Sequence, residues 1–206
     1  RWIENKMNAY LNKILRTTDA DYVIAADTDS IYLNLGPFVH EVFKGREKSD
    51  ESIVRFLDKV CQVEFEKYIG DSYEALASYV NAYAQKMFMK RENIANRGIW
   101  TAKKRYILNV FDSEGVRYKT PKLKINGIEA VKSSTPAPCR TAIKDALKVI
   151  MNGTESELQK FIADFREKFE AMPVEDIAFP RGCNNVTKNS SPSTIYGKGC
   201  PMHVRG

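Results

Sequence analysis

Two aspartates separated by one residue, Asp27 and Asp29, are the side chains of this chain whose type and spacing best suit chemistry. They lie where two apolar, strand-like runs meet, at Asp27-Thr28-Asp29-Ser30. Residues two apart share one face of a strand, so both carboxylates can be aimed at one point. Close carboxylates demand a cation, and Mg²⁺ combines a few carboxylates with substrate phosphates. The pair therefore predicts metal-dependent phosphoryl transfer, and an ordinary Asp-rich turn is the alternative.

A basic run followed by an aromatic residue, Lys103-Lys104-Arg105-Tyr106, is the second constellation. We expect it on a strand, where alternation would place Lys104 and Tyr106 on one face, able to reach a groove of a nucleic acid together. Twelve lysines and arginines lie between residues 86 and 132, which predicts a phosphate-binding surface there. A solvated basic strand is the alternative.

The composition is that of a globular protein with a moderate basic bias. Of the 206 residues 43% are apolar, and 32 Lys and Arg against 26 Asp and Glu give a formal charge of +6, compatible with a polyanion partner. We find no apolar run near the ~20 residues that span a bilayer and no signal segment, so we expect an intracellular protein with no membrane partner. Wide spacing and only two histidines argue against zinc, and we expect reduced thiols at Cys61, Cys139, Cys183 and Cys200.

The pattern of apolar residues predicts an α+β fold. We expect the aspartate hairpin and a second group of strands to form one antiparallel sheet, with the helices packed against it. Helices are expected to about residue 16 and over 50–83, with a break at Gly70-Asp71. Strands are expected at about 86–95, 99–111, 116–119 and 123–131.

Helices return after the strands. Thr135 and Pro136 favour a helix to about residue 152, and Thr154 with Glu157 forms a capping box for another, to about Met172. Residues 173–206 lack periodicity and are expected to be irregular.

Since the chain opens at Arg1 inside an amphipathic helix and ends without a terminal element, we expect a segment of a longer protein.

The order of four motifs resembles family B DNA polymerases, in particular the replicative polymerases of T-even-type bacteriophages. The motifs are Asp27-Thr-Asp-Ser30, Lys103-Lys-Arg-Tyr106, Lys124-Ile-Asn-Gly-Ile-Glu129 and Ser133-Ser-Thr-Pro136. The resemblance covers nearly the whole chain, from the opening helix at Trp2 into 200–206. It implies a palm subdomain over 1–134, with its antiparallel sheet and packed helices, and the beginning of a helical thumb over 135–206.

The resemblance also implies roles for single residues. Asp29 becomes the metal ligand and Asp27 its partner, with Thr28 and Ser30 as accessory residues of the same motif. Glu92 becomes an accessory carboxylate, although Lys90 stands where the phage enzymes carry an acid. The residues implied to bind the primer–template duplex are Lys103, Lys104, Arg105, Tyr106, Lys124 and Gly127.

The partners and cofactors that follow are those of a primer-extending polymerase. The resemblance implies two Mg²⁺ ions in the complete enzyme, which this segment need not hold by itself, together with primer–template DNA and deoxynucleoside triphosphates. The fingers, a proofreading exonuclease, the rest of the palm and another catalytic aspartate would lie outside the chain, as would a sliding clamp. We therefore expect negligible polymerase activity from the segment alone, and the cytoplasm of the host cell as its location if it is viral.

Two other functions compete with this interpretation. A non-catalytic DNA-binding module would use the basic strands and bind without any divalent cation. A nuclease or another two-metal phosphotransferase also uses paired aspartates, but no Asp, Glu and His cluster completes a hydrolytic site in the sequence.

A palm without its neighbours would also expose apolar surface, so we expect self-association as a dimer.

Overall fold

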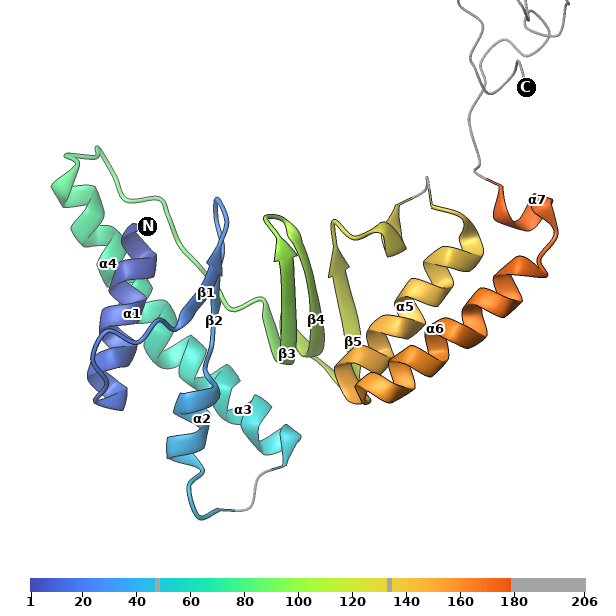
Figure 1. Cartoon of the computed structure of the whole chain (residues 1–206). Helices are drawn as coiled ribbons and strands as arrows, with labels where there is room; N and C mark the ends of the chain where they lie inside the picture. Colours follow the sequence, from blue (N-terminus) through green and yellow to red (C-terminus); the bar gives the residue numbers. More distant parts are fainter. Residues whose placement is uncertain (47–48, 133–134, 179–206) are drawn as a thin grey trace, which may run out of the picture. The chain divides into compact units, whose positions relative to one another are not determined.

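A computed structural model describes residues 1–46, 49–132 and 135–178, which form a mixture of helices and strands (Figure 1). This confirms the predicted α+β class. In chain order the elements are α1 (Trp2–Leu15), β1 (Val23–Ala26), β2 (Ile31–Leu33), α2 (Gly36–Val42), α3 (Asp50–Val60), the π-helical turn η1 (Cys61–Phe65), α4 (Glu66–Tyr79), β3 (Asn93–Ala102), β4 (Arg105–Ser113), β5 (Val116–Asn126), the 3-10 turn η2 (Glu129–Val131), α5 (Ala137–Asn152), α6 (Glu155–Glu170) and α7 (Val174–Ile177).

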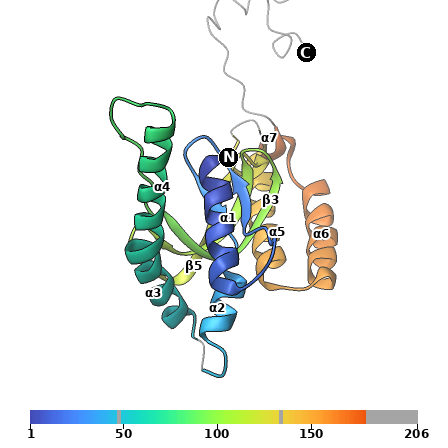
Figure 2. The same cartoon turned by 90° about the vertical axis from the view of Figure 1, so that its left-hand side faces the viewer.

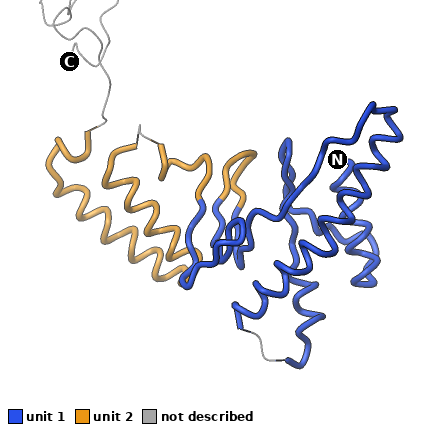
Figure 3. The backbone as a smooth tube through the Cα atoms, turned by 180° about the vertical axis from the view of Figure 1, so that it is seen from behind, with its two compact units in different colours: residues 1–99, 107–124 blue, residues 100–106, 125–206 orange. Residues whose placement is uncertain are grey.

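The chain divides into two compact units (Figure 3). Unit 1 consists of residues 1–99 and 107–124, and unit 2 of residues 100–106 and those from 125 onward. Strands β3, β4 and β5 contribute residues to both units. The predicted palm and thumb ranges, 1–134 and 135–206, stay a prediction.

Helix α1 lies beside α4 in unit 1 (Figures 1 and 2). Its residues at four-residue spacing, Ile3, Met7 and Leu11, face the core, and the last two are fully buried, as an amphipathic helix requires. The Trp2 indole N–H donates to the Ser72 carbonyl at 3.0 Å, which ties the two helices together at the start of α1. The predicted opening helix is confirmed.

Helices α3 and α4 follow each other through a π-helical turn rather than through the predicted break at Gly70. The Ser49 side chain caps α3 by accepting from the Ser52 amide at 3.2 Å, and the reciprocal bond from the Ser49 amide to the Ser52 hydroxyl completes a capping box. The irregularity lies at Cys61–Phe65, and α4 continues through Gly70. One glycine costs only about 1 kcal/mol in a helix, so a well-packed helix tolerates it.

A short helix, α2, lies in the connection between β2 and α3, where we expected no helix. Pro37 lies in its first turn, where a missing N–H is harmless, and Phe38 is buried against the aromatic rings of α3 and η1. A run of only seven residues gives too few turns for a helical period to be recognised in the sequence.

The strands of the described ranges form two sheets, so the single sheet that we expected is wrong. Strands β1 and β2 pair antiparallel with each other, and the second sheet has the order β3-β4-β5. Residues 86–92 do not form the predicted strand, and pairing begins only at Asn93. The predicted strand over 99–111 is instead two strands joined by a turn at Lys103-Lys104, and the last two predicted strands merge into β5.

The β3-β4-β5 sheet is antiparallel because its connections are only two residues long. Both residues of the β4–β5 turn, Glu114 and Gly115, have positive φ values of 52° and 89°. This is the backbone geometry that suits the twist of a two-residue hairpin. Strand β4 is the central strand, which explains why its residues are the most buried of the sheet.

Helices α5 and α6 lie side by side in unit 2 (Figure 1). The Glu157 carboxylate accepts from the Thr154 amide at 2.7 Å, and this confirms the predicted capping box of α6. Helix α5 is entered from Pro136, which serves as its N-cap without a side-chain bond, so the cap expected at Thr135 is not formed. The predictions for 179–206, among them Cys183, Cys200 and His203, lie outside the described residues. Within the described ranges, no helix has the length and apolar character needed to span a membrane.

Candidate functional site

The aspartate hairpin of unit 1 turns tightly at its tip. The Asp27 amide donates to the Ser30 carbonyl at 2.9 Å, so Thr28 and Asp29 form the turn between β1 and β2. The Thr28 amide donates to Asp27 Oδ1 at 2.8 Å, which fixes that carboxylate. Asp27 is half-buried and Asp29 is exposed. The hairpin is as predicted, but Asp29 lies in the turn, so strand alternation does not place the two aspartates on one face.

Two asparagines of α1 hold the chain where it enters the hairpin. Asn8 Oδ1 accepts from the amides of Tyr22 and Val23, at 2.8 and 3.1 Å. One turn later, the Asn12 side chain bonds both backbone groups of Ala20, donating to the carbonyl at 2.7 Å and accepting from the amide at 3.0 Å. Sequence reasoning missed these residues. The available signal was a pair of amide side chains four apart, beside the apolar stripe of a helix.

The hairpin supplies a small donor set for a cation. Among the described residues no group of three His, Cys, Asp or Glu side chains is arranged to hold a metal ion. Mg²⁺, however, is commonly bound through one or two carboxylates, with waters and substrate phosphates as the other ligands. In donor type, the exposed Asp29 and the oriented Asp27 therefore suit a cation that takes only one or two ligands from this hairpin.

The basic run of unit 2 lies at a turn and not within a strand. Lys103 and Lys104 join β3 to β4, and Lys104 has a φ of 60°, which is uncommon for a residue with a side chain. Tyr106 has entered β4 and is 9% exposed. The expected shared face of Lys104 and Tyr106 is thus wrong, because alternation does not continue through a turn. Contact of the four residues with DNA stays a prediction.

The segment after β5 packs against this turn within unit 2. Arg105 Nη2 lies 2.5 and 2.6 Å from the two carboxylate oxygens of Glu129, and Lys132 Nζ lies 3.1 Å from one of them. Gly127 has a φ of 65°, and a Cβ atom there would lie 2.3 Å from the Lys104 carbonyl oxygen. The structure therefore brings together the Lys103–Tyr106 motif and Gly127, two predicted features separated by some 20 residues.

Glu92 and Lys124, predicted as accessory carboxylate and DNA-binding residue, also lie together. Their charged groups are 3.6 Å apart in unit 1, and both side chains are exposed. The backbone of Glu92 is held by the Glu114 amide, which donates to its carbonyl at 2.6 Å. The start of β3 is thereby tied to the β4–β5 turn.

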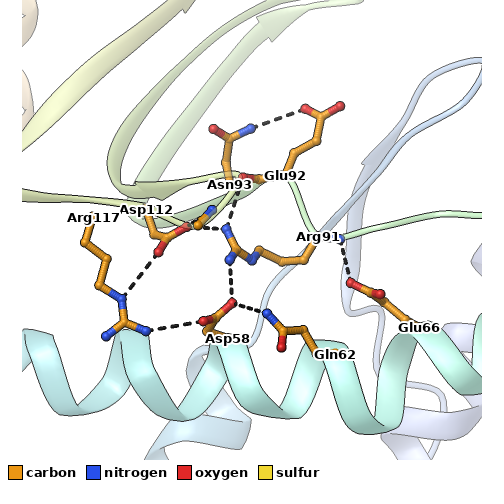
Figure 4. Close-up of polar contacts among 9 residues, drawn as sticks. Asp58, Gln62, Glu66, Arg91, Glu92, Asn93, Asp112 and Arg117 are labelled. Carbon is orange, nitrogen blue, oxygen red and sulfur yellow. Dashed lines mark hydrogen bonds and ion pairs between the residues drawn. The ribbon is translucent and has the colours of Figure 1, made fainter.

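A neutral cluster of two arginines and two aspartates joins α3 to the sheet strands of unit 1 (Figure 4). Arg91 bonds both Asp58 of α3 and Asp112 of β4, and Arg117 of β5 lies 3.2 Å and 3.4 Å from the same two carboxylates. Asp112 is fully buried and the Arg91 side chain is 8% exposed. We refer to these four residues as the Arg91 cluster.

Asp112 lies just beyond the predicted strand 99–111, and sequence reasoning missed the Arg91 cluster. The signal that could have found it was a carboxylate at the end of an otherwise apolar strand, 105–113, because such a group needs a cationic partner when the strand is buried. The cluster fixes Arg91, and with it the position of its neighbour Glu92: the Arg91 guanidinium donates to the Glu92 carbonyl at 3.2 Å.

Comparison with known proteins shows the class of protein that the chain resembles. No protein-family model matches the chain. Over its whole length, however, the chain is similar to proteins described as DNA-directed DNA polymerases.

The relatives are two phage proteins. Over 214 aligned positions the chain is 33% identical to the polymerase of Enterobacteria phage T4 and 36% identical to that of Escherichia phage RB69. It spans 24% of the length of each. The chain thus matches about a quarter of each of these two phage DNA polymerases, and this similarity confirms the resemblance to T-even-type phage polymerases seen in the motifs.

Proposed function

We propose that the chain is the part of a family B replicative DNA polymerase that carries the Asp27–Ser30 hairpin of the active site and a basic surface for primer–template DNA. The observation that carries this proposal is the similarity to two phage DNA polymerases over the whole chain. The substrates would be a primer–template duplex and deoxynucleoside triphosphates, and the enzyme would act inside the infected host cell. Fingers, exonuclease and the remaining palm residues would come from the rest of the polypeptide, and a sliding clamp would be a separate partner.

The hairpin supports a role in nucleotidyl transfer through what its residues offer. Asp29 lies exposed at the tip of a short, hydrogen-bonded turn, and Asp27 is held by the Thr28 amide. Mg²⁺, when bound, polarises phosphoryl oxygens and lowers the pKa of a coordinated hydroxyl. Asp29 would hold such ions together with a further aspartate from elsewhere in the palm. With roughly half of the ligands, the isolated segment would show negligible polymerase activity.

The basic turn supports a role in duplex binding. Lys103 and Lys104 lie at the tip of the β3–β4 connection, where ammonium groups can reach phosphates or the minor groove. The minor groove presents similar acceptors for every correct base pair, so a lysine there senses the geometry of the pair without reading its sequence. Lys124 would contact the primer backbone in the same sequence-independent way.

Replacing Asp29 tests the catalytic role. In the complete polymerase, Asp29→Ala is expected to lower single-turnover primer extension by about 10³-fold, because the loss of several kcal/mol of charge stabilisation corresponds to three decades of rate. The affinity for primer–template DNA should stay within about twofold of the parent, since Asp29 is not a phosphate contact. Rapid-quench extension and equilibrium DNA binding measure the two quantities.

Asp71→Ala serves as the matched control, because Asp71 is an exposed aspartate on α4 outside the hairpin. It should leave both quantities unchanged. Near-normal extension by Asp29→Ala would refute the metal-binding role. In that case a non-catalytic DNA-binding module, with binding that is equal in Mg²⁺ and in EDTA, becomes the better description of the chain.

A further inference from the structure

The Lys103-Lys104 turn has a backbone that needs support from its surroundings. Lys104 adopts the left-handed conformation, which costs a residue with a side chain roughly 1–2 kcal/mol. A turn of this kind persists only where neighbouring structure holds it. The segment 127–132, which follows β5 in the same unit, supplies that support at two points.

The first point of support is a backbone contact at Gly127. A Cβ atom at this position would lie 2.3 Å from the Lys104 carbonyl oxygen and 3.0 Å from Arg105 Cγ, and the φ of 65° also disfavours any side chain. The obstructing atom belongs to the backbone, so it cannot rotate away. Gly115, which also has a positive φ, has no atom within 4 Å of such a Cβ, so its role is conformational only. Gly127 is distinguished by the close approach to the turn.

The second point is the carboxylate of Glu129. Both of its oxygens accept from one nitrogen of Arg105, the residue that directly follows the turn, and Lys132 approaches one of them. The hydrogen bond from its own backbone amide, then Lys132 and Arg105, hold the pKa of Glu129 below its ordinary value. Glu129 is therefore charged at neutral pH and compensates the charge of Arg105.

We propose that Gly127 and Glu129 are positioning residues that hold the Lys103-Lys104 turn in its binding conformation, and that Arg105 serves this internal contact rather than a DNA phosphate. This inference rests on the proposed role of the turn in duplex binding. It changes the role expected for Arg105 and Gly127: the two lysines contact DNA, whereas Arg105, Gly127 and Glu129 keep them in place.

The substitution Glu129→Gln distinguishes the two possible roles of Arg105, because they predict opposite changes in the affinity for DNA. If Arg105 contacted a phosphate, removing the neighbouring carboxylate would strengthen DNA binding and steepen its salt dependence, because a cation would be released toward the DNA. If Glu129 positions the turn, the same change loosens the turn and weakens binding, by about fivefold on the scale of one charge-assisted hydrogen bond, with the salt slope unchanged. The measurement is equilibrium binding of a fluorescent primer–template duplex to the complete polymerase over a range of salt concentrations.

Asp145→Asn is the matched control. It removes one acidic charge from the exposed Lys148–Asp145 pair on α5, in the same unit, and thus reports the effect of net charge alone. Weaker binding by Glu129→Gln but not by Asp145→Asn supports the proposal. Equal effects of the two variants, or tighter binding by Glu129→Gln, would overturn it.

Charge reversal adds a test of rescue. Arg105→Glu alone should weaken binding, and the double variant Arg105→Glu with Glu129→Arg should recover most of the affinity because the ion pair is restored. Hydrogen exchange at 102–106 should quicken in the single variants and return toward the parent rate in the double variant. If the double variant exchanges and binds as poorly as Arg105→Glu, the pair does not position the turn.

Lys104→Ala distinguishes failure of this inference from failure of the proposed function. Loss of the Lys104 ammonium should weaken binding and, where it contacts a phosphate, reduce the slope of log affinity against log salt by about 0.9. If Lys104→Ala leaves both the affinity and the slope unchanged, the turn is not a DNA contact and both ideas fail. If Lys104→Ala has its expected effect while Glu129→Gln does not weaken binding, the positioning role alone is wrong.

Discussion

At the scale of the single residue, Cys61 has a thiol that its surroundings keep protonated. It opens the π-helical turn and packs against the core of unit 1, and burial raises its pKa to about 11. The thiolate is the reactive form, and three pKa units leave only about one thiol in a thousand ionised near pH 8. We expect the Cys61 peptide of the native chain to be alkylated by iodoacetamide at least tenfold more slowly than in urea. Peptide mass spectrometry measures both rates, and equal rates would show that the thiol is not protected.

The candidate residues divide into those that sequence can find and those that it cannot. Asp27 and Asp29 could be predicted because a turn between two apolar runs is a local pattern. The partner of Arg105 could not, because Glu129 lies 24 positions away and the pairing depends on how 127–132 folds back. The expected common face of Lys104 and Tyr106 failed for a related reason, since a single positive φ at Lys104 ends the alternation.

At the scale of the element, the Arg91 cluster fastens α3 to the central strand. Asp112→Asn would leave the buried Arg91 guanidinium with only one of its two carboxylate partners. Breaking a buried ion pair in this way lowers the free energy of unfolding by about 3 kcal/mol or more. We therefore expect a clear fall in the urea midpoint at neutral pH. Glu51→Gln, which breaks the exposed Arg55–Glu51 pair on α3, should cost under about 0.5 kcal/mol. Similar midpoints for the two variants would contradict a structural role of the cluster.

The cluster also makes stability depend on pH in a definite direction. Desolvation opposes ionisation of Asp58, but the hydrogen bonds and charges of Arg91 and Arg117 outweigh it and lower its pKa. A lowered folded-state pKa gives stability that is present above the unfolded value of about 3.9 and is lost as pH falls through the folded value. The stability gap between the parent and Asp58→Asn should be large at pH 7 and smaller at pH 3, because it narrows as the pH falls from the unfolded-state pKa toward the folded-state pKa. Urea titrations at both pH values measure it, and a constant gap would contradict the linkage.

Elements with a clear local signature were predictable, and their arrangement in sheets was not. The capping boxes at Ser49 and Thr154 mark helix starts through contacts three residues apart. By contrast, two predictions were wrong because they depend on which strands pair: the single sheet, and the strand over residues 86–92. The alternation of apolar residues does not determine strand pairing. The turn at Lys103 was missed because lysines carry no turn signal of the kind that Gly or Asn gives.

At the scale of the whole molecule, an exposed apolar segment around the end of α4 predicts self-association. Tyr79, Val80, Tyr83 and Phe88 are all more than half exposed, and Tyr83 is fully exposed. Several exposed apolar side chains this close together in the sequence favour contact with another molecule. We expect the chain to form a dimer as its concentration rises, and the double variant Tyr83→Lys with Phe88→Lys to remain monomeric. Gel filtration with light scattering tests this, and a monomer at all concentrations for the parent chain counts against it.

The π-helical turn at Cys61–Phe65 has a consequence for how the length of the chain can change. Leu57 and Tyr73 would lie roughly 160° apart around an uninterrupted α-helix, yet both are buried in the same core. The wide turn takes up about one residue and thereby brings the two apolar stripes back toward one side. A descendant that lost one residue here could close the turn into ordinary α-helix with its core unchanged. The same loss inside α1 would rotate Met7 and Leu11 out of phase with the rest of their stripe. This turn is therefore the position along these helices where the loss of one residue would disturb the core least.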